Sequence, residues 1–303
     1  MTDADRLLAE LRPVAFAIAY RMLGSHAEAE DVVQEALLRL HGALERGERI
    51  ESPRAYLATV TTRLAIDELR SARARRETYA GEWLPEPLLA AREEPAARVE
   101  EAESLSYAFL VLLESLTPEE RAVLLLHDVF DYGYGEIAET IGKSIDNTRQ
   151  IAVRARGHVD ERRPRFEQSA ERRRELGDRF FAAAQEGELE GLERLLTRDV
   201  VLRGDGGGKV PALARPLQGP NRVARALLNW IRAGISRGAT FEAVEINGLP
   251  GAIGRAPDGG IVSAMVLDVS VDGIAGVNSV VNPDKLAHLG PVGDMLSLLR
   301  DRG

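Results

Sequence analysis

The stretch from Tyr134 to Arg156, YGEIAETIGKSIDNTRQIAVRAR, contains two helical patterns separated by a turn. The first pattern places Ile137 and Ile141 on one face, and Gly142 can supply the left-handed turn that ends a helix. Ser144 is a typical N-cap residue for the helix that follows. This arrangement predicts a helix-turn-helix, in which the first residues of the second helix reach base edges in the major groove.

The early side chains of that second helix are suited to DNA recognition. Asparagine, glutamine and arginine can make paired hydrogen bonds to adenine or guanine. The basic tail Arg162, Arg163 and Arg165 is suited to phosphate contacts. Read alone, the segment could also be an ordinary helical hairpin. The predicted DNA-contacting residues are Ser144, Asp146, Asn147, Arg149, Gln150 and Arg154.

Two amphipathic helices are predicted upstream. In residues 27–40 the apolar positions form one stripe, which leaves Asp31, Gln34, Glu35 and Leu38 on the opposite face. A longer helix begins at Ser52-Pro53 and runs to Arg76. Its last sixteen residues hold five arginines against two acidic residues. Arginines, an aromatic residue and hydroxyl groups on one helix favour phosphate contacts and base stacking.

In combination these segments resemble the extracytoplasmic-function sigma factor family. Residues 20–25 (YRMLGS) and 29–35 (AEDVVQE) are similar to the core-binding helices of that family. Residues 52–57 (SPRAYL) and 63–70 (RLAIDELR) are similar to its −10 recognition segment, and residues 116–121 (LTPEER) to its region 4.

The resemblance implies a bacterial protein that binds core RNA polymerase, through its β and β′ subunits, and recognises and helps to open promoter DNA. It also implies no enzymatic activity and no cofactor or metal. The implied polymerase contacts are Asp31, Gln34, Glu35 and Leu38. The implied −10 contacts are Arg54, Tyr56, Arg63, Asp67, Arg70 and Arg73, and the helix-turn-helix would bind the −35 element.

About 130 residues follow the part that resembles a sigma factor. Helices followed by strands, with Gly-, Pro- and Asp-containing turns between them, predict α+β packing. This order resembles a SnoaL-like cone of the nuclear-transport-factor-2 type, a curved sheet with helices around a pocket. The expected helices are 171–196 and 223–232, and the expected strands are 241–246, 252–253, 261–267 and 274–281.

Three short motifs extend the resemblance over nearly the whole chain. The strings DGGGK (205–209), NPDKL (282–286) and WLPEP (83–87) together resemble the sigma group that carries a fused SnoaL-like domain. DGGGK is not a P-loop, because Arg203 replaces the first glycine and Val210 replaces Ser/Thr. By spacing alone the first two could be ordinary loops.

The resemblance to this group implies that the fused domain regulates the sigma factor in cis, with the DGGGK loop packed near the linker and the two sigma domains. Replacing Lys209 is then expected to alter the linker contacts. The implied regulatory residues are Trp83, Pro85, Asp205, Gly206, Gly207, Gly208, Lys209, Asn282, Pro283, Asp284, Lys285 and Leu286.

Charge divides the chain into four parts: residues 1–76, an acidic linker at 77–104, residues 105–165, and residues 171–303. The linker holds three prolines and eight acidic residues against two arginines. The net charge of −9 argues against a protein that coats DNA by bulk attraction alone.

The absence of cysteine excludes disulfides and thiolate metal sites. No apolar run long enough for a membrane helix and no signal peptide are found, which favours a cytoplasmic location and no membrane partner.

Two other functions are compatible with these patterns. A helix-turn-helix regulator could bind an operator without docking on polymerase. Alternatively, the cone could be a small-molecule enzyme or could sense an unknown small ligand, with Asp268, Trp230 and His288 as pocket or rim residues. A general base needs a second polar group at the reacting atom, and no such pair is identifiable. His288 is expected to be a surface or cap residue.

Overall fold

The computed structural model describes residues 3–77, 79–89, 106–160 and 169–300, and it divides into two compact units. Unit 1 comprises Met1–Glu77 and Leu110–Arg163, and unit 2 comprises Thr78–Phe109 and Pro164–Gly303. The two predicted DNA-binding modules therefore fold in one unit, and the described start of the linker folds with the C-terminal part.

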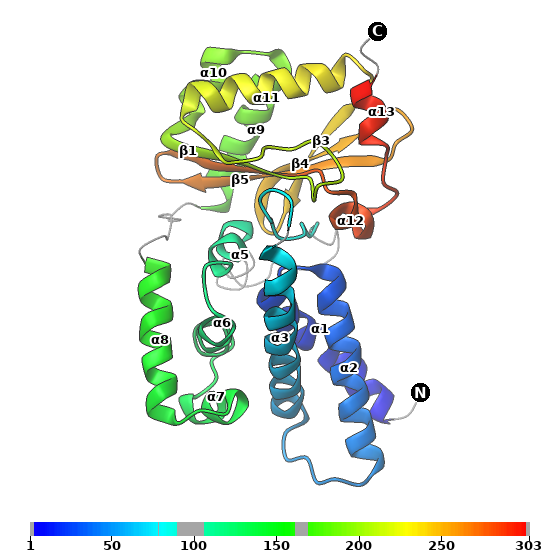
Figure 1. The fold of residues 1–303 in the computed structure, drawn as a ribbon, viewed down its shortest axis with the longest axis vertical. Coiled ribbons are helices and arrows are strands. Elements are labelled where there is room, and N and C mark those ends of the chain that lie inside the picture. The colour runs from blue at the N-terminus through cyan, green and yellow to red at the C-terminus, as the bar shows by residue number, and fades with distance from the viewer. Residues whose placement is uncertain (1–2, 78, 90–105, 161–168, 301–303) are drawn as a thin grey trace. The chain divides into compact units, whose positions relative to one another are not determined.

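The N-terminal half of unit 1 is formed by α1 (Asp3–Leu23), α2 (His26–Glu45) and α3 (Pro53–Glu77), which pack against one another (Figure 1). Ser25 accepts a hydrogen bond from the Glu28 amide, and Ser52 accepts one from the Ala55 amide. These hydroxyls begin α2 and α3 because they satisfy amides that have no partner within the helix.

The C-terminal half of unit 1 contains the helix-turn-helix. It is preceded by α5 (Tyr107–Leu113), α6 (Pro118–Leu124) and a π-helix at Leu125–Val129, and consists of α7 (Tyr134–Ile141) and α8 (Ile145–Asp160). The capping box of Thr117 and Glu120 begins α6, and Gly142 ends α7 with a φ of 67°.

The small core beneath this motif consists of Val123, Leu126, Ile137, Ile151 and Ala152. The predicted helix-turn-helix is confirmed.

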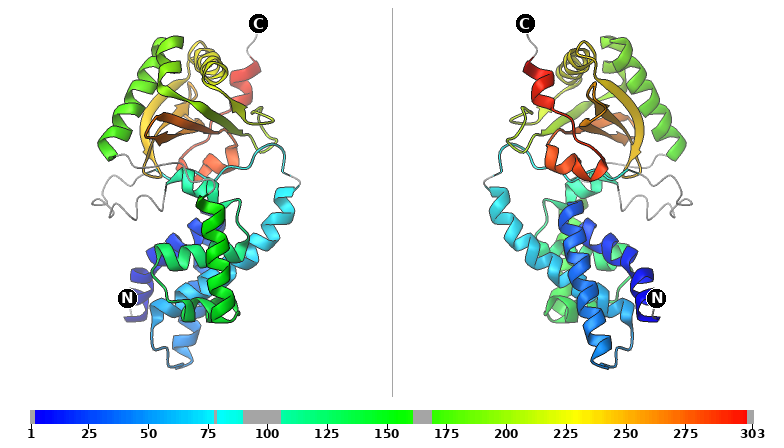
Figure 2. Two further views of the ribbon diagram at one scale, coloured as in Figure 1. Left: turned by 90° about the vertical axis from the view of Figure 1, so that its left-hand side faces the viewer. Right: turned by 90° about the vertical axis from the view of Figure 1, so that its right-hand side faces the viewer.

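Unit 2 is built on a six-stranded sheet with the order β2-β1-β6-β5-β4-β3, in which only β1 and β6 are parallel. Figures 1 and 2 show α9, α10 and α11 together on one face of this sheet. The predicted α+β class is confirmed. The strands are β1 (Leu196–Asp205), β2 (Leu217–Gln218), β3 (Thr240–Ile246), β4 (Leu249–Arg255), β5 (Ile261–Ser270) and β6 (Gly273–Val280). The helices of unit 2 are α9 (Ala170–Glu186), α10 (Leu189–Leu195), α11 (Pro220–Ile235), α12 (Pro283–Leu286), a 3-10 turn at Ala287–Leu289 and α13 (Met295–Arg300).

The single helix expected at residues 171–196 was wrong in two respects. Gly187 adopts a left-handed φ of 74° and ends α9, so that α10 is a separate helix. The helix also ends before Leu196, which already belongs to β1. Arg198 and Asp199 interrupt the apolar pattern of β1. For this reason the strand, whose last residue Asp205 begins the DGGGK motif, was not predicted.

The two faces of the sheet have different partners. Val200 and Leu202 of β1 belong to the apolar cluster formed with α9, α10 and α11. Because side chains alternate along a strand, Arg203 and Asp205 point to the opposite face. Residues 79–89 lie on that opposite face (Figure 1). The linker start therefore covers the sheet where the helices do not.

Candidate functional site

The predicted polymerase-binding residues share one exposed face of α2. Asp31, Gln34, Glu35 and Leu38 are all exposed, whereas Val33 and its neighbours on the other side are buried. Leu38 is 58% exposed, although it is a large apolar residue in the middle of a helix. Contiguous apolar patches with a polar rim mark surfaces that bind other proteins, and Leu38 belongs to such a patch with Leu8 and Leu37.

A hollow of about 450 Å³ lies beside this face, between α1 and α2. Gln34 and Leu38 line it together with Leu8 and Leu37, and Arg12 pairs with Glu30 at its wall. The face therefore offers an apolar depression with acidic and amide groups at its edge. It suits a partner segment that carries both aliphatic and basic side chains.

Within unit 1, the predicted −10 residue Arg63 is engaged with the helix-turn-helix. Its guanidinium donates hydrogen bonds of 2.9 Å to the Thr140 carbonyl and 2.8 Å to the Glu139 carbonyl, at the C-terminal end of α7. Thr59 lies 3.2 Å from Thr140 through their hydroxyl oxygens. A cation is favourable at this position because a helix C-terminus carries partial negative charge.

Arg70, a second arginine of α3, also contacts another helix of unit 1. It donates a 2.6 Å hydrogen bond to Glu119 of α6, and the same ion pair lowers the pKa of Glu119 against the raising effect of burial. Arg54 and Asp67 are exposed, and Tyr56 is half-buried. The side chain of Arg73 lies outside the described residues. The structure thus places Arg63 and Arg70 against α7 and α6.

A further arginine, Arg121 of α6, also connects helices of unit 1. It is buried, with only 3% exposure. Its guanidinium donates to the Met22 carbonyl at the end of α1 and to the Leu113 carbonyl, both at 2.6 Å, and pairs with Glu114 at 2.9 Å. A buried cation is stable only when it is paired with a counter-charge and hydrogen-bonded. Arg121 therefore ties α6 to the end of α1.

Most predicted −35 residues are available on α8. Asp146, Arg149, Gln150 and Arg154 are exposed, Asn147 is partly exposed, and Ser144 caps the helix by accepting from the Asn147 amide. The basic tail at Arg162, Arg163 and Arg165 lies outside the described residues. Val153, which was not among the predicted contacts, is 69% exposed on this face. Helical spacing from Arg149 and Gln150 was the signal for it.

The motif residues of unit 2 meet at a buried carboxylate. Asp205 has no exposed surface and accepts hydrogen bonds from the Tyr79 hydroxyl at 2.6 Å, the Leu84 amide at 2.8 Å and the Gly207 amide at 3.0 Å. Burial and the neighbouring Asp205 raise the pKa of Tyr79, so that its hydroxyl remains a donor. The carboxylate therefore holds both the linker and its own loop.

Lys285 completes this cluster from α12. Its ammonium group lies 2.7 Å from Asp205, donates to the Leu84 carbonyl, and lies 3.9 Å from the centre of the Trp83 ring. Only 5% of Lys285 is exposed. A cation over an indole ring and against a buried carboxylate is favourable on both counts. We refer to Asp205, Asn282, Lys285, Tyr79 and Leu84 as the linker clasp.

The glycines of DGGGK allow the loop to approach its partners. Gly207 has a φ of 60°, and a Cβ there would lie 2.3 Å from the Asn282 amide nitrogen. Asn282 in turn donates to the Tyr79 hydroxyl at 2.9 Å. A Cβ on Gly208 would lie 2.8 Å from Ala80. Side chains at these positions would therefore push the loop away from α12 and from the linker.

Further contacts hold the linker beyond Leu84. The Tyr107 hydroxyl donates to the Pro85 carbonyl at 2.7 Å. Leu88 exchanges hydrogen bonds of 2.9 Å with Asn247, which adopts a left-handed φ of 50°. His288, which we expected at the surface, is half-buried, and its Nε2 lies 2.7 Å from the Pro87 carbonyl.

The expected effect of replacing Lys209 on the linker contacts stays a prediction, and the ion-pair partner of Lys209 among the described residues lies on α12. The Lys209 side chain is 54% exposed and pairs with Asp284 at 2.7 Å. Lys285 makes the linker contacts instead, because α12 turns it towards Asp205 while Asp284 faces solvent. Pro283 and Leu286, the remaining residues of NPDKL, lie against an adjoining cavity.

The residues considered for an enzyme do not form a reactive pair. Asp268 is buried on β5, and its Oδ2 accepts a 2.9 Å hydrogen bond from Asn278, whereas Trp230 is exposed on α11. Burial raises the pKa of Asp268. Asp268 Oδ1 and Asn278 Oδ1 are both buried without a hydrogen-bond partner among the described residues. Both belong to the sheet face opposite the helices, not to a pocket between sheet and helices.

Replacing Asp268 with asparagine is expected to stabilise unit 2 near neutral pH by about 1–3 kcal/mol, because the new amide can donate to Asn278 Oδ1. The raised pKa means that the folded wild type binds its proton more tightly than the unfolded chain does. Wild-type stability should therefore fall as the pH rises above the ordinary carboxyl pKa of about 4, and the variant should lack this fall.

Urea unfolding between pH 4 and 8 tests this expectation. Tryptophan fluorescence reports on unit 2 alone, since both tryptophans, Trp83 and Trp230, belong to it. Parallel pH profiles for the wild type and the variant would contradict it.

Comparison with known proteins places both helical modules in one family. Residues 7–75 match the model of sigma-70 region 2, and residues 106–159 match that of sigma-70, region 4. Within the described residues, no helix is both long and apolar enough to span a membrane.

Relatives extend the match over the C-terminal unit. The ECF RNA polymerase sigma factor SigJ of Mycobacterium tuberculosis is 37% identical over 288 residues, which cover 91% of this chain and 90% of that protein. The crystal structure of that extracytoplasmic function sigma factor superposes with a TM-score of 0.75 and 32% identity, over 94% of this chain and 98% of the other. The probable sigma factor SigI of the same species is 36% identical over 59% of this chain and 62% of its own length.

Proposed function

Since this chain belongs to the extracytoplasmic-function RNA polymerase sigma factors, we propose that each of its surfaces has a separate role in promoter-directed initiation. The exposed face of α2 binds core RNA polymerase. The arginines of α3 contact the −10 element, and the exposed face of α8 reads the −35 element. Unit 2 controls these steps in cis through the linker clasp.

The observation that carries polymerase binding is the exposed face around Leu38. Its acidic residues and the adjoining hollow fit a basic helical segment with aliphatic side chains, and the β′ coiled coil is the partner we assign to it. Burial of one leucine side chain contributes about 1.5–3 kcal/mol. This single residue can therefore decide whether a complex forms at micromolar concentration.

Replacing Leu38 with aspartate is expected to weaken binding to core polymerase at least tenfold, because a charge would occupy the apolar depression. Val271, which is 45% exposed in a turn of unit 2, provides the control, and Val271→Asp should bind like the wild type. Co-elution with core polymerase and promoter-directed transcription in vitro measure the effect. A wild-type chain that neither co-elutes nor supports specific transcripts would overturn the proposed function.

Support for control in cis comes from the chemistry of the linker clasp. The linker connects the two DNA-binding modules, and unit 2 holds its start through a buried ion pair, backbone hydrogen bonds and an indole ring. The conformation of the linker is thereby coupled to the state of α12 and the DGGGK loop. A change in α12 or in the DGGGK loop therefore alters the linker, and the linker is joined to both DNA-binding modules.

A further inference from the structure

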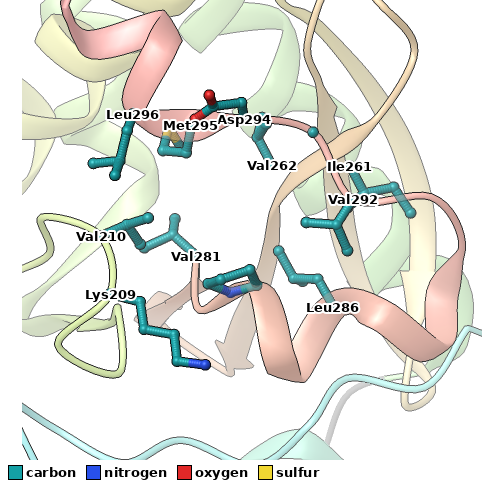
Figure 3. Close-up of a pocket in the computed structure, with 12 residues that line it drawn as sticks. Lys209, Val210, Ile261, Val262, Val281, Leu286, Val292, Asp294, Met295 and Leu296 are labelled. Atoms are coloured by element: carbon teal, nitrogen blue, oxygen red, sulfur yellow. The ribbon is translucent and has the colours of Figure 1, made fainter.

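A cavity of about 210 Å³ lies behind the linker clasp, in unit 2. Figure 3 shows that four segments surround it: the end of the DGGGK loop, α12, the start of β5 and the segment leading into α13. Its walls are mainly aliphatic. They include Val210, Ile261, Val281, Leu286, Val292 and Met295.

The size and walls of the cavity define the kind of molecule that fits. An apolar cavity of about 150 Å³ in a protein interior stays dry and takes up benzene. The present cavity is somewhat larger and mainly aliphatic, but it is partly open, since the lining residues Lys209 and Val292 are exposed. It has room for a single substituted ring or a short branched chain. Filling it would restore contacts that aliphatic walls otherwise lack.

The charges at the cavity exclude an anionic occupant. Lys209 is the cation among the lining residues, and two of its three N–H groups already donate to the carboxylate of Asp284. Asp284 does not itself line the cavity; the lining carboxylate is Asp294, which accepts from the amide and hydroxyl of Ser297 at the start of α13. Two carboxylates against one ammonium disfavour another negative charge, whereas one acceptor can use the remaining N–H of Lys209.

The cavity shares its walls with the linker clasp. On α12, Pro283 and Leu286 line the cavity, while Lys285 and the N-cap residue Asn282 contact the linker. The DGGGK loop is divided in the same way, since Lys209 lines the cavity and Asp205 binds the linker. An occupant that displaces either segment must therefore change the contacts of residues 79–84.

We propose that this cavity binds an uncharged, largely hydrocarbon molecule the size of a substituted benzene, with one hydrogen-bond acceptor near Lys209, and that its occupancy alters the linker clasp. The second part rests on the proposed control in cis. The first part concerns binding alone and stands whether or not the chain docks on polymerase.

Anisole and benzoate are matched probes for the first part, because they share a ring and differ in charge. In full-length protein with ¹³C-labelled Ile, Leu and Val methyl groups, anisole should shift the resonances of Val210, Ile261, Val281 and Leu286 to saturation. Benzoate should bind at least tenfold more weakly. Val292→Phe and, separately, Met295→Phe should fill the cavity and abolish the anisole shifts.

Failure of these methyl groups to respond up to the solubility of anisole would overturn the binding site. So would equal binding of benzoate, or unchanged binding by both filled variants. The coupling is read separately from Trp83 emission in a Trp230→Phe background. Anisole should change this emission in the parent and not in Val292→Phe, and methyl shifts without any change in Trp83 would refute the coupling.

Discussion

Replacing Lys285 with methionine is expected to destabilise unit 2 by about 3–5 kcal/mol, since it leaves the buried carboxylate of Asp205 without its cation. Methionine keeps the length and the apolar stem that packs near Trp83, so the loss is that of the charge and its hydrogen bonds. Residues 79–84 should lose their attachment to α12 first, because the Leu84 carbonyl also depends on this ammonium group.

Lys209→Met is the matched control, because it removes the same charge from an exposed pair with Asp284. Such pairs contribute about 0–1 kcal/mol. Urea unfolding followed by tryptophan fluorescence should separate the two variants by at least 2 kcal/mol. In transcription with core polymerase, Lys285→Met should change promoter output severalfold, and Lys209→Met should not. Equal stability and equal output of the two variants would refute the linker clasp as the element of control.

Replacing Arg121 with methionine is expected to destabilise unit 1 by about 3–5 kcal/mol, because it removes the buried cation that links the Met22 carbonyl, the Leu113 carbonyl and the Glu114 carboxylate. The ends of α1 and α6 should separate more often. Hydrogen exchange of amides in these helices measures this, since unit 1 contains no tryptophan.

Arg46→Met serves as its control. The Arg46 side chain is 64% exposed and pairs with Glu48 at the end of α2, so its loss should change exchange little. Faster exchange throughout α1 and α6 in Arg121→Met alone is the expected result. Identical exchange in both variants would show that the buried guanidinium does not hold these helices together.

The helical modules could be predicted because their signals are local. Thr117 and Gly142 mark a helix start and a helix end by their own chemistry, and the apolar spacing of α2 and α7 is visible within two turns. The same holds for the exposed faces of α2 and α8, since the side chains opposite a buried stripe must face solvent.

The choice between Lys209 and Lys285 could not be made from the sequence. Lys209 ends the DGGGK string and Lys285 lies within the NPDKL string, and the local chemistry of the two is alike. Only the packing of α12, which contacts β5 and brings Lys285 to Asp205 at the end of β1, buries one and exposes the other. The strand β1 could not be predicted for a related reason. Arg198 and Asp199 interrupt the alternation of its apolar residues, and the strand is defined only by its pairing with β6.

The position of Arg63 has a consequence for any measured promoter affinity. Its Nε and one Nη2 hydrogen bind the carbonyls of Thr140 and Glu139, so the Nε–Nη2 edge cannot make a paired contact with a DNA phosphate until these bonds break. For the proposed paired contact of this edge with the −10 element, a free chain must first give up these bonds. The apparent dissociation constant is then the intrinsic one divided by the fraction of molecules in which α3 and α7 have already parted. A variant that favours the parted form would bind promoter DNA more tightly without gaining a single new contact to it.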